Sequence, residues 1–153
     1  MAIQAQAGYS GTPLWKKLGF KTGMKVCALA APQHYAELID GPNDWVMMKT
    51  PAGADALHLF IIEKAGLTKI AELAGHLPPA AMLWVSWPKK TSSLSMGLSE
   101  DDIRKAALAC GLVDVKVCAV DADWSGLKLA RRASSPTREA HAARMGARLA
   151  KKA

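Results

Sequence analysis

The chain has 153 residues, half of them hydrophobic, which is enough to bury a sizeable core in one domain and excludes general disorder. The net charge is +7, but seven of the 20 lysine and arginine residues and only one of the 13 acidic residues lie from Arg131 onward. Residues 1–130 therefore carry only +1, so the basic composition is weak evidence for a folded domain that binds nucleic acid.

The N-terminal residues 1–11 are small and polar and contain Gly8 and Gly11, which predicts an N-terminal arm. They lack the basic and long apolar regions of a secretory signal, and no apolar run approaches the ~20 residues of a membrane span. We therefore expect a soluble, cytoplasmic protein. Thr12 as N-cap and Pro13 as first helical residue predict a short helix over 14–18 that ends at Gly19.

The middle of the chain alternates strand and helix patterns. We predict strands over 25–31, 45–49 and 55–62, a short helix over 33–40, and a second helix over 63–77 whose apolar residues recur at helical spacing. The segment from Met82 to Trp87 is almost wholly apolar and is flanked by prolines. This pattern is typical of a strand over 80–87 that is buried on both faces.

The last third begins with Ser99 as the N-cap of a helix whose first turn is acidic and whose end is marked by Gly111. Residues 113–117 and 124–130 then predict a hairpin. The whole order predicts an α/β fold over residues 12–132: an open, mostly parallel, Rossmann-like sheet with helices on both faces and a C-terminal antiparallel hairpin. Residues 133–153 read as a basic tail rich in alanine and arginine.

The candidate ligand site lies where the central strand ends. Lys89 and Lys90 follow that strand directly, and ligands of open α/β sheets bind at the carboxyl ends of strands. We predict that Ser86, Trp87, Lys89 and Lys90 contact a small anionic metabolite, although the two lysines are also typical of a solvated loop. Trp84 and Trp87 should point to opposite faces, one into the core and the other toward a pocket.

Other polar residues are weaker candidates. His34, beside the end of the first strand, is the best histidine for acid–base chemistry or ligand contact, but no carboxylate partner can be identified for it. Tyr9 and Ser10 could fold over the strand ends as a lid, or simply lead into the first helix. His58 lies in a strand and reads as a core histidine.

Neither metal nor covalent catalysis has a sequence signature in this chain. The three cysteines have no Cys-x-x-Cys spacing and lie in apolar runs, as buried reduced thiols do. The histidines and cysteines show no metal-ligand spacing, and nucleophile and phosphate-loop motifs are absent from the sequence. We therefore assign no catalytic residue and no metal ligand.

Two resemblances extend this interpretation. The order of elements over residues 21–132, with Lys21-Thr22-Gly23-Met24-Lys25-Val26 at the entry to the first strand, resembles a class I methyltransferase domain. More specifically, three segments resemble a small bacterial family of unknown function: 8–14 (GYSGTPL), 84–90 (WVSWPKK), and 111–121 with 124–128 (GLVDVKVCAVD and WSGLK). The first resemblance implies a Rossmann-like fold, and the second implies no known activity.

The chain departs from methyltransferases at the loop after the first strand. That family has a glycine-rich loop there, so that the backbone can approach S-adenosylmethionine, whereas this chain has Ala30-Ala31-Pro32-Gln33-His34 and no glycine before Gly41. Only Asp44 is a candidate for the acid that holds ribose hydroxyls.

We therefore predict a non-catalytic binding or accessory module that uses no cofactor. The alternative is a minimal methyltransferase dependent on S-adenosylmethionine. A third hypothesis is association with nucleic acid through the basic tail alone.

Overall fold

The computed structural model describes residues 12–41 and 44–131, so the predicted arm (1–11) and basic tail (133–153) lie outside the described residues. The helical elements are α1 (Leu14–Leu18), α2 (Tyr35–Leu38), the 3-10 helix η2 (Lys64–Leu67), α3 (Thr68–Ala74) and α4 (Glu100–Ala109). The strands are β1 (Lys25–Leu29), β2 (Val46–Met47), β3 (Ala56–Phe60), β4 (Met82–Pro88), β5 (Leu112–Ala119) and β6 (Trp124–Arg131).

These strands form one six-stranded sheet in the order β2-β1-β3-β4-β6-β5. The first four strands in this order are parallel, with Val26 of β1 opposite Ala56 of β3 and Leu57 opposite Leu83 of β4. The hairpin β5–β6 is added antiparallel, so that Trp124 lies opposite Pro88 at the carboxyl end of β4. The predicted fold class, an open and mostly parallel sheet ending in an antiparallel hairpin, is confirmed.

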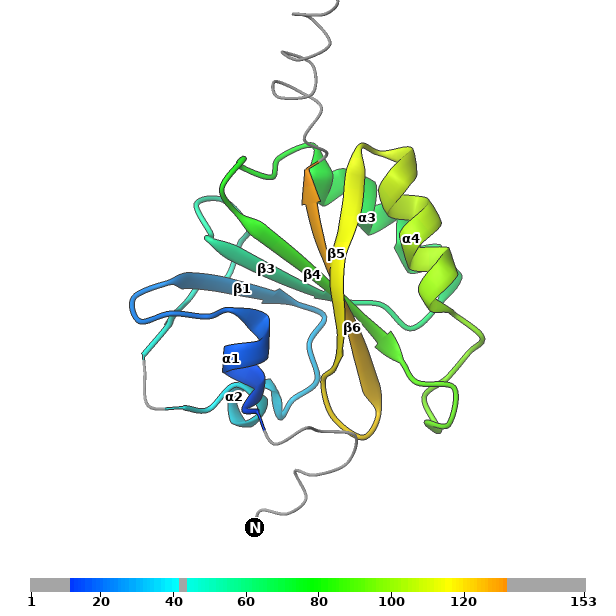
Figure 1. The fold of residues 1–153 in the computed structure, drawn as a ribbon, viewed down its shortest axis with the longest axis horizontal. Coiled ribbons are helices and arrows are strands. Elements are labelled where there is room, and N and C mark those ends of the chain that lie inside the picture. The colour runs from blue at the N-terminus through cyan, green and yellow to red at the C-terminus, as the bar shows by residue number, and fades with distance from the viewer. Residues whose placement is uncertain (1–11, 42–43, 132–153) are drawn as a thin grey trace, which may run out of the picture.

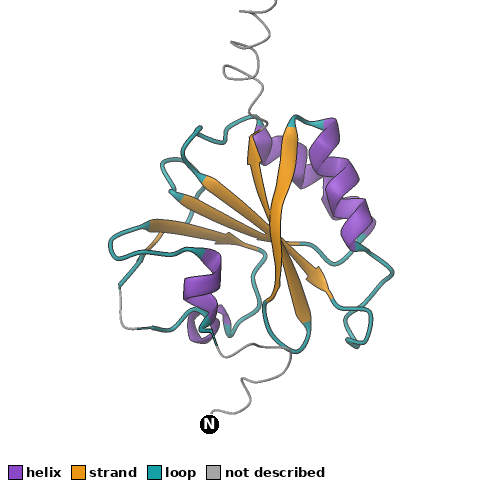
Figure 2. Cartoon of the chain, in the orientation of Figure 1, coloured by secondary structure: helices purple, strands orange, loops and turns teal. Residues whose placement is uncertain are grey.

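Helices cover both faces of the sheet (Figures 1 and 2). α1 and α2 lie on one face, where buried residues such as Leu18, Tyr35 and Trp84 form one core. α3 and α4 lie on the other face, over a second core that includes Ile70 and Ile103. Among the described residues no helix is long and apolar enough to cross a membrane.

Strand β4 is buried on both faces, as its apolar pattern predicts. Trp84 is fully buried in the core under α1, and its indole Nε1 donates to the carbonyl of Leu18 at 3.0 Å. Trp87 belongs to the core under α3 and α4 and is 5% exposed. The expectation that the two tryptophans point to opposite faces is therefore confirmed.

Several element ends differ from the prediction. The segment 63–77, predicted as one helix, begins as the 3-10 helix η2, continues as α3 and ends at Ala74. β1 ends at Leu29, two residues early, and α2 is a single turn. At α1 the N-cap residue is Pro13 rather than Thr12. Shifts of one to three residues are ordinary, because terminal turns lack part of their hydrogen bonding.

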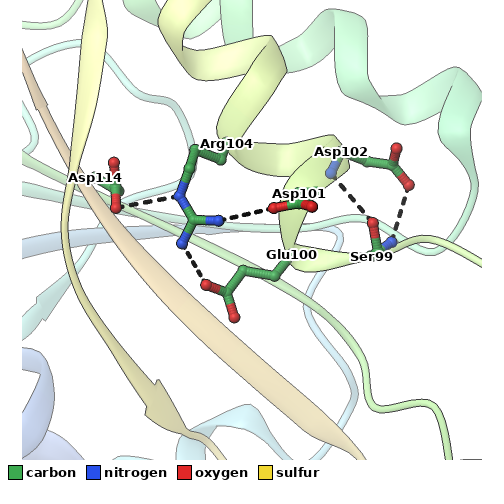
Figure 3. A network of polar contacts seen from close by, with 6 residues as sticks. All are labelled: Ser99, Glu100, Asp101, Asp102, Arg104 and Asp114. Atoms are coloured by element: carbon green, nitrogen blue, oxygen red, sulfur yellow. Dashed lines mark hydrogen bonds and ion pairs between the residues drawn. The ribbon is translucent and has the colours of Figure 1, made fainter.

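Helix α4 begins with the predicted cap. The Ser99 hydroxyl accepts from the Asp102 backbone N–H, and the Asp102 carboxylate accepts from the Ser99 N–H at 3.0 Å, which completes a capping box (Figure 3). Those bonds lower the pKa of the Asp102 carboxyl, chiefly through the bond from the Ser99 backbone. The cap fixes where α4 starts, beside the end of β4.

Candidate functional site

In open α/β sheets, ligands bind at the carboxyl ends of the parallel strands. β1, β3 and β4 all end at one edge of the sheet, and the β5–β6 turn reaches the same edge because Trp124 lies opposite Pro88. The described residues form a cavity near this edge on the α4 side of β4, and another between β1, β3 and α3.

The first, which we call the lysine cavity, has a volume of about 600 Å³. Its lining includes two adjacent lysines, a tryptophan, two acids and a hydroxyl: Trp87, Lys89, Lys90, Glu100, Asp101 and Ser125. The Lys89 backbone N–H donates to the Asp123 carbonyl at 2.8 Å, which ties the segment after β4 to the β5–β6 turn. Three of the predicted ligand-contacting residues, Trp87, Lys89 and Lys90, therefore line one cavity.

The acidic side of the lysine cavity is held by one arginine. Arg104 on α4 contacts Glu100, binds Asp101 at 3.0 Å, and donates from Nε to Asp114 of β5 at 3.2 Å (Figure 3). Hydrogen bonds from Arg104, first of all to Glu100, raise the pKa of its guanidinium. Lys89 and Lys90, by contrast, form no ion pair with any of the described residues. The positive charges of the two lysines are thus not compensated by ion pairs with the described residues, whereas the negative charges of the acids are.

Ser86, the fourth predicted contact, is elsewhere. It is fully buried on the opposite face of β4 from Trp87, and its Oγ is 2.7 Å from Nε2 of His58. Nδ1 of His58 is in turn 2.9 Å from the Tyr35 hydroxyl. An added Cβ at Gly126 would lie 3.3 Å from Ser86 Oγ, so the hairpin closes tightly over this hydroxyl. Ser86 does not line the lysine cavity.

The buried chain Tyr35–His58–Ser86 is a structural network. Burial lowers the pKa of His58 to about 3 and raises the pKa of Tyr35, so both side chains are neutral at physiological pH. The His58 ring also stacks on Phe60, with centroids 4.3 Å apart. The interpretation of His58 as a core histidine with satisfied hydrogen bonds is confirmed.

His34 has a carboxylate partner that the sequence did not reveal. Its Nε2 is 3.1 Å from Oδ2 of Asp121, a residue of the β5–β6 turn, and the two side chains are 46% and 18% exposed. The other carboxylate oxygen of Asp121 accepts the backbone N–H groups of Asp123 and Trp124, so the carboxylate is held in place. The expectation that no partner could be found for His34 is wrong. Neither residue lines either cavity.

The second cavity, which we call the β1/β3 cavity, has a volume of about 640 Å³. The chain leaves β1 through α2 toward one edge of the sheet and returns in β3 on the other side of β1, so this is a topological switch point. Ligands of open α/β sheets bind at such points. The lining is mostly apolar and includes Leu29, Ala30, Leu59, Ile61, Glu63 and Leu73.

The turn after β1 has an unusual backbone. Ala30 has a φ of 57°, and it is the one non-glycine residue with positive φ among the described residues. That left-handed conformation is the one glycine adopts without strain. Asp44, the candidate ribose ligand, precedes β2, and its carbonyl accepts the N–H of Gly23 before β1. It therefore lies at the amino edge, away from the cavity.

Tyr9 and Ser10 lie outside the described residues. The three cysteines form no disulfide, and burial raises the pKa of each thiol, which leaves them little thiolate character. The described part of the chain contains no group of three histidine, cysteine or acidic side chains that could hold a metal ion.

The comparisons with known proteins concern the fold. A protein assigned as a type 11 methyltransferase from Sulfolobus solfataricus aligns over 78% of this chain and 90% of its own, with 14% identity and a TM-score of 0.51. The mitomycin 7-O-methyltransferase MmcR aligns over 78% of this chain and 53% of its own, with 9% identity and a TM-score of 0.53. The chain thus has a class I methyltransferase-like Rossmann fold.

One further solved structure holds the methyl donor. The magnesium protoporphyrin IX methyltransferase of Synechocystis PCC 6803, with S-adenosylmethionine bound, aligns over 72% of this chain and 71% of its own, with 16% identity and a TM-score of 0.44. No protein-family model and no curated protein matches the sequence.

Proposed function

We propose that this chain is a non-catalytic binding module that holds a small organic anion in the lysine cavity. The observation that carries the proposal is the convergence of Trp87, Lys89 and Lys90 on one cavity of about 600 Å³. Two ammonium groups without ion pairs to the described residues attract a carboxylate or a phosphate ester as point charges. The indole of Trp87 offers an apolar wall for the body of the ligand.

The acids of the lysine cavity constrain how such a ligand is oriented. Glu100 and Asp101 line the same space and repel an anion, although Arg104 compensates part of their charge. The anionic group therefore belongs at Lys89 and Lys90, and hydroxyl or amine donors of the ligand belong toward α4. A small molecule with its charge at one end suits this arrangement best.

The cofactor that the fold implies, S-adenosylmethionine, does not fit the residues present. The turn after β1 carries the methyl group of Ala30 at the cavity, and Pro32 offers no N–H donor. β2 is followed by Met48, Lys49 and Thr50, so no acid stands where ribose hydroxyls would be held. Methyl transfer therefore has less support here than ligand binding, and we derive no step of it.

Nucleic-acid binding through residues 133–153 stays a prediction, because that segment lies outside the described residues. The residues that line the lysine cavity are not part of that segment.

The proposal is tested by thermal unfolding with phenyl phosphate, 4-hydroxybenzoate, inorganic phosphate, S-adenosylmethionine and S-adenosylhomocysteine. A ligand at 100 times its Kd stabilises by about 2.7 kcal/mol, which raises Tm by several degrees at this size. We expect a shift with an organic anion that is lost in Lys89→Ala/Lys90→Ala and kept in Lys21→Ala/Lys25→Ala. The control pair removes the same charge at the amino edge of the sheet.

Two results contradict the proposal. One is a shift with an organic anion that persists in Lys89→Ala/Lys90→Ala, because the anion would then bind elsewhere. The other is a clear shift with S-adenosylmethionine or S-adenosylhomocysteine and with no other probe, which would favour the methyltransferase alternative.

A further inference from the structure

The β1/β3 cavity is larger than the lysine cavity and lies on the switch point of the sheet, yet the proposed function makes no use of it. Its inner wall is built from buried aliphatic side chains, with Leu59 3% exposed, Ile61 3% and Leu73 8%. Ile62 at its mouth is 36% exposed. A wall of this kind favours a ligand with an apolar body.

The shape of this wall depends on a close approach of η2 to Ile61, the residue directly after β3. A Cβ added to Gly66 would lie 2.8 Å from Cγ2 of Ile61, so only glycine lets η2 pack this closely. Ala30, in its left-handed conformation, also lines this cavity. The surrounding structure must hold such a strained residue in place, and backbone strain of this kind is concentrated at ligand sites.

The polar groups of the β1/β3 cavity have a net negative charge. Glu63, Lys69 and Glu72 contribute the charged side chains of the lining. Lys69 Nζ lies 3.9 Å from Glu72 Oε1, so this ion pair compensates the charge of Glu72. The Glu63 side chain makes no hydrogen bond or ion pair with any of the described residues. One carboxylate at the end of β3 is therefore left uncompensated.

We infer that the β1/β3 cavity binds a small molecule with an apolar body and a protonated amine, the amine directed to Glu63. A cation next to an unpaired carboxylate gains a charge-assisted hydrogen bond, while an anion there is repelled. This inference is independent of the lysine cavity, which favours the opposite charge.

The test uses three probes of one shape: 2-phenylethylamine, neutral 2-phenylethanol and anionic 3-phenylpropanoate. Binding is followed by titration of backbone amide NMR signals in the full chain at pH 7. We expect the amine to shift signals of residues 29–30 and 59–66 and to bind about fivefold more tightly than the alcohol, with weaker binding still for the anion.

Substitutions test whether Glu63 causes the preference for the amine over the alcohol. In Glu63→Gln we expect the amine and the alcohol to bind equally, whereas Glu37→Gln on α2 should keep the preference. Ala65→Phe should block both ligands by filling the cavity. Lys89→Ala/Lys90→Ala should leave amine binding unchanged, so failure here is distinct from failure of the anion site.

Three outcomes would overturn the inference. They are equal affinity for amine and alcohol in the unchanged protein, a preference that survives Glu63→Gln, and tight binding of S-adenosylmethionine that displaces the amine from this cavity.

Discussion

His58 Nε2 lies 2.7 Å from Ser86 Oγ in the interior of the sheet, with neither residue exposed to solvent. With the Tyr35 hydroxyl on Nδ1, both ring nitrogens have a partner. A neutral imidazole can donate from one nitrogen and accept at the other, so this arrangement satisfies the ring without charge. The polar groups of the interior therefore stabilise the fold only while His58 is neutral.

The pH dependence of stability follows from this neutral state. The pKa of His58 is about 3 in the folded protein, below the ordinary value of 6.5, so the unfolded chain binds more protons between these values. The stabilisation is complete above pH 6.5 and is lost as the pH falls toward 3. We expect the free energy of unfolding to fall by up to about 1.4 kcal/mol per pH unit from this group.

Urea unfolding between pH 7.5 and 4 checks this, with His58→Gln compared with the unchanged protein. The difference in the free energy of unfolding between the unchanged protein and His58→Gln should shrink as the pH falls, because only the unchanged protein has the titrating imidazole. Exposed His76→Gln is the control and should follow the unchanged protein. Asp102, whose pKa is lowered, loses its contribution in acid in every variant, so it cancels. If the free energy of unfolding of His58→Gln falls with pH in parallel with that of the unchanged protein, His58 is not the group responsible.

Ser86→Ala should destabilise the fold without affecting the lysine cavity. It leaves a buried imidazole nitrogen without its partner, which costs about 1–3 kcal/mol. Exposed Ser93→Ala, the control, should change stability by less than about 0.5 kcal/mol. Urea unfolding at pH 7.5 measures both. Loss of anion binding in folded Ser86→Ala would contradict the placement of Ser86 away from that cavity.

The sequence predicts well what depends on near neighbours in the chain. Gly19 ends α1 with a φ of 83°, and Ser99 starts α4 through its capping box, both from local chemistry. The two-residue period of β4 puts Trp84 and Trp87 on opposite faces. The same period puts Ser86 on the face opposite Trp87, which separates it from the lysine cavity.

Other features depend on residues far apart in the sequence. Asp121 comes beside His34 across 87 positions, only because the β5–β6 turn reaches the edge where β1 ends. The β1/β3 cavity likewise combines Leu29 and Ala30, after β1, with residues up to Leu73 of α3. Patterns of period and capping carry no information about such contacts.

Ala30→Gly should stabilise the protein. A left-handed alanine costs roughly 1–2 kcal/mol, and glycine removes that strain while adding about 0.5–1 kcal/mol of chain entropy to the unfolded state. Exposed Ala36→Gly on α2 adds the same chain entropy to the unfolded state without relieving strain, and should destabilise by about 1 kcal/mol. Urea midpoints should therefore move in opposite directions. Equal destabilisation by both changes would mean that Ala30 is not strained.

The Asp121 carboxylate contacts both the β5–β6 turn and His34, and substitutions can separate the two contributions to stability. One carboxylate oxygen caps the β5–β6 turn by accepting from the N–H groups of Asp123 and Trp124 at 2.8 and 2.9 Å, while the other contacts His34. Asp121→Asn keeps an oxygen acceptor for the turn, whereas Asp121→Ala removes it. We expect a loss of about 1–2 kcal/mol for Ala and less than about 0.5 kcal/mol for Asn in urea unfolding.

His34→Gln completes the comparison, because the exposed pair should add little stability. If Asp121→Asn and His34→Gln each cost as much as Asp121→Ala, the contact between α2 and the hairpin holds the edge together. If only Asp121→Ala is costly, Asp121 stabilises the turn, and its contact with His34 adds little to the stability. The contacts favour the second result, since two backbone donors fix one oxygen while a single, half-exposed imidazole meets the other.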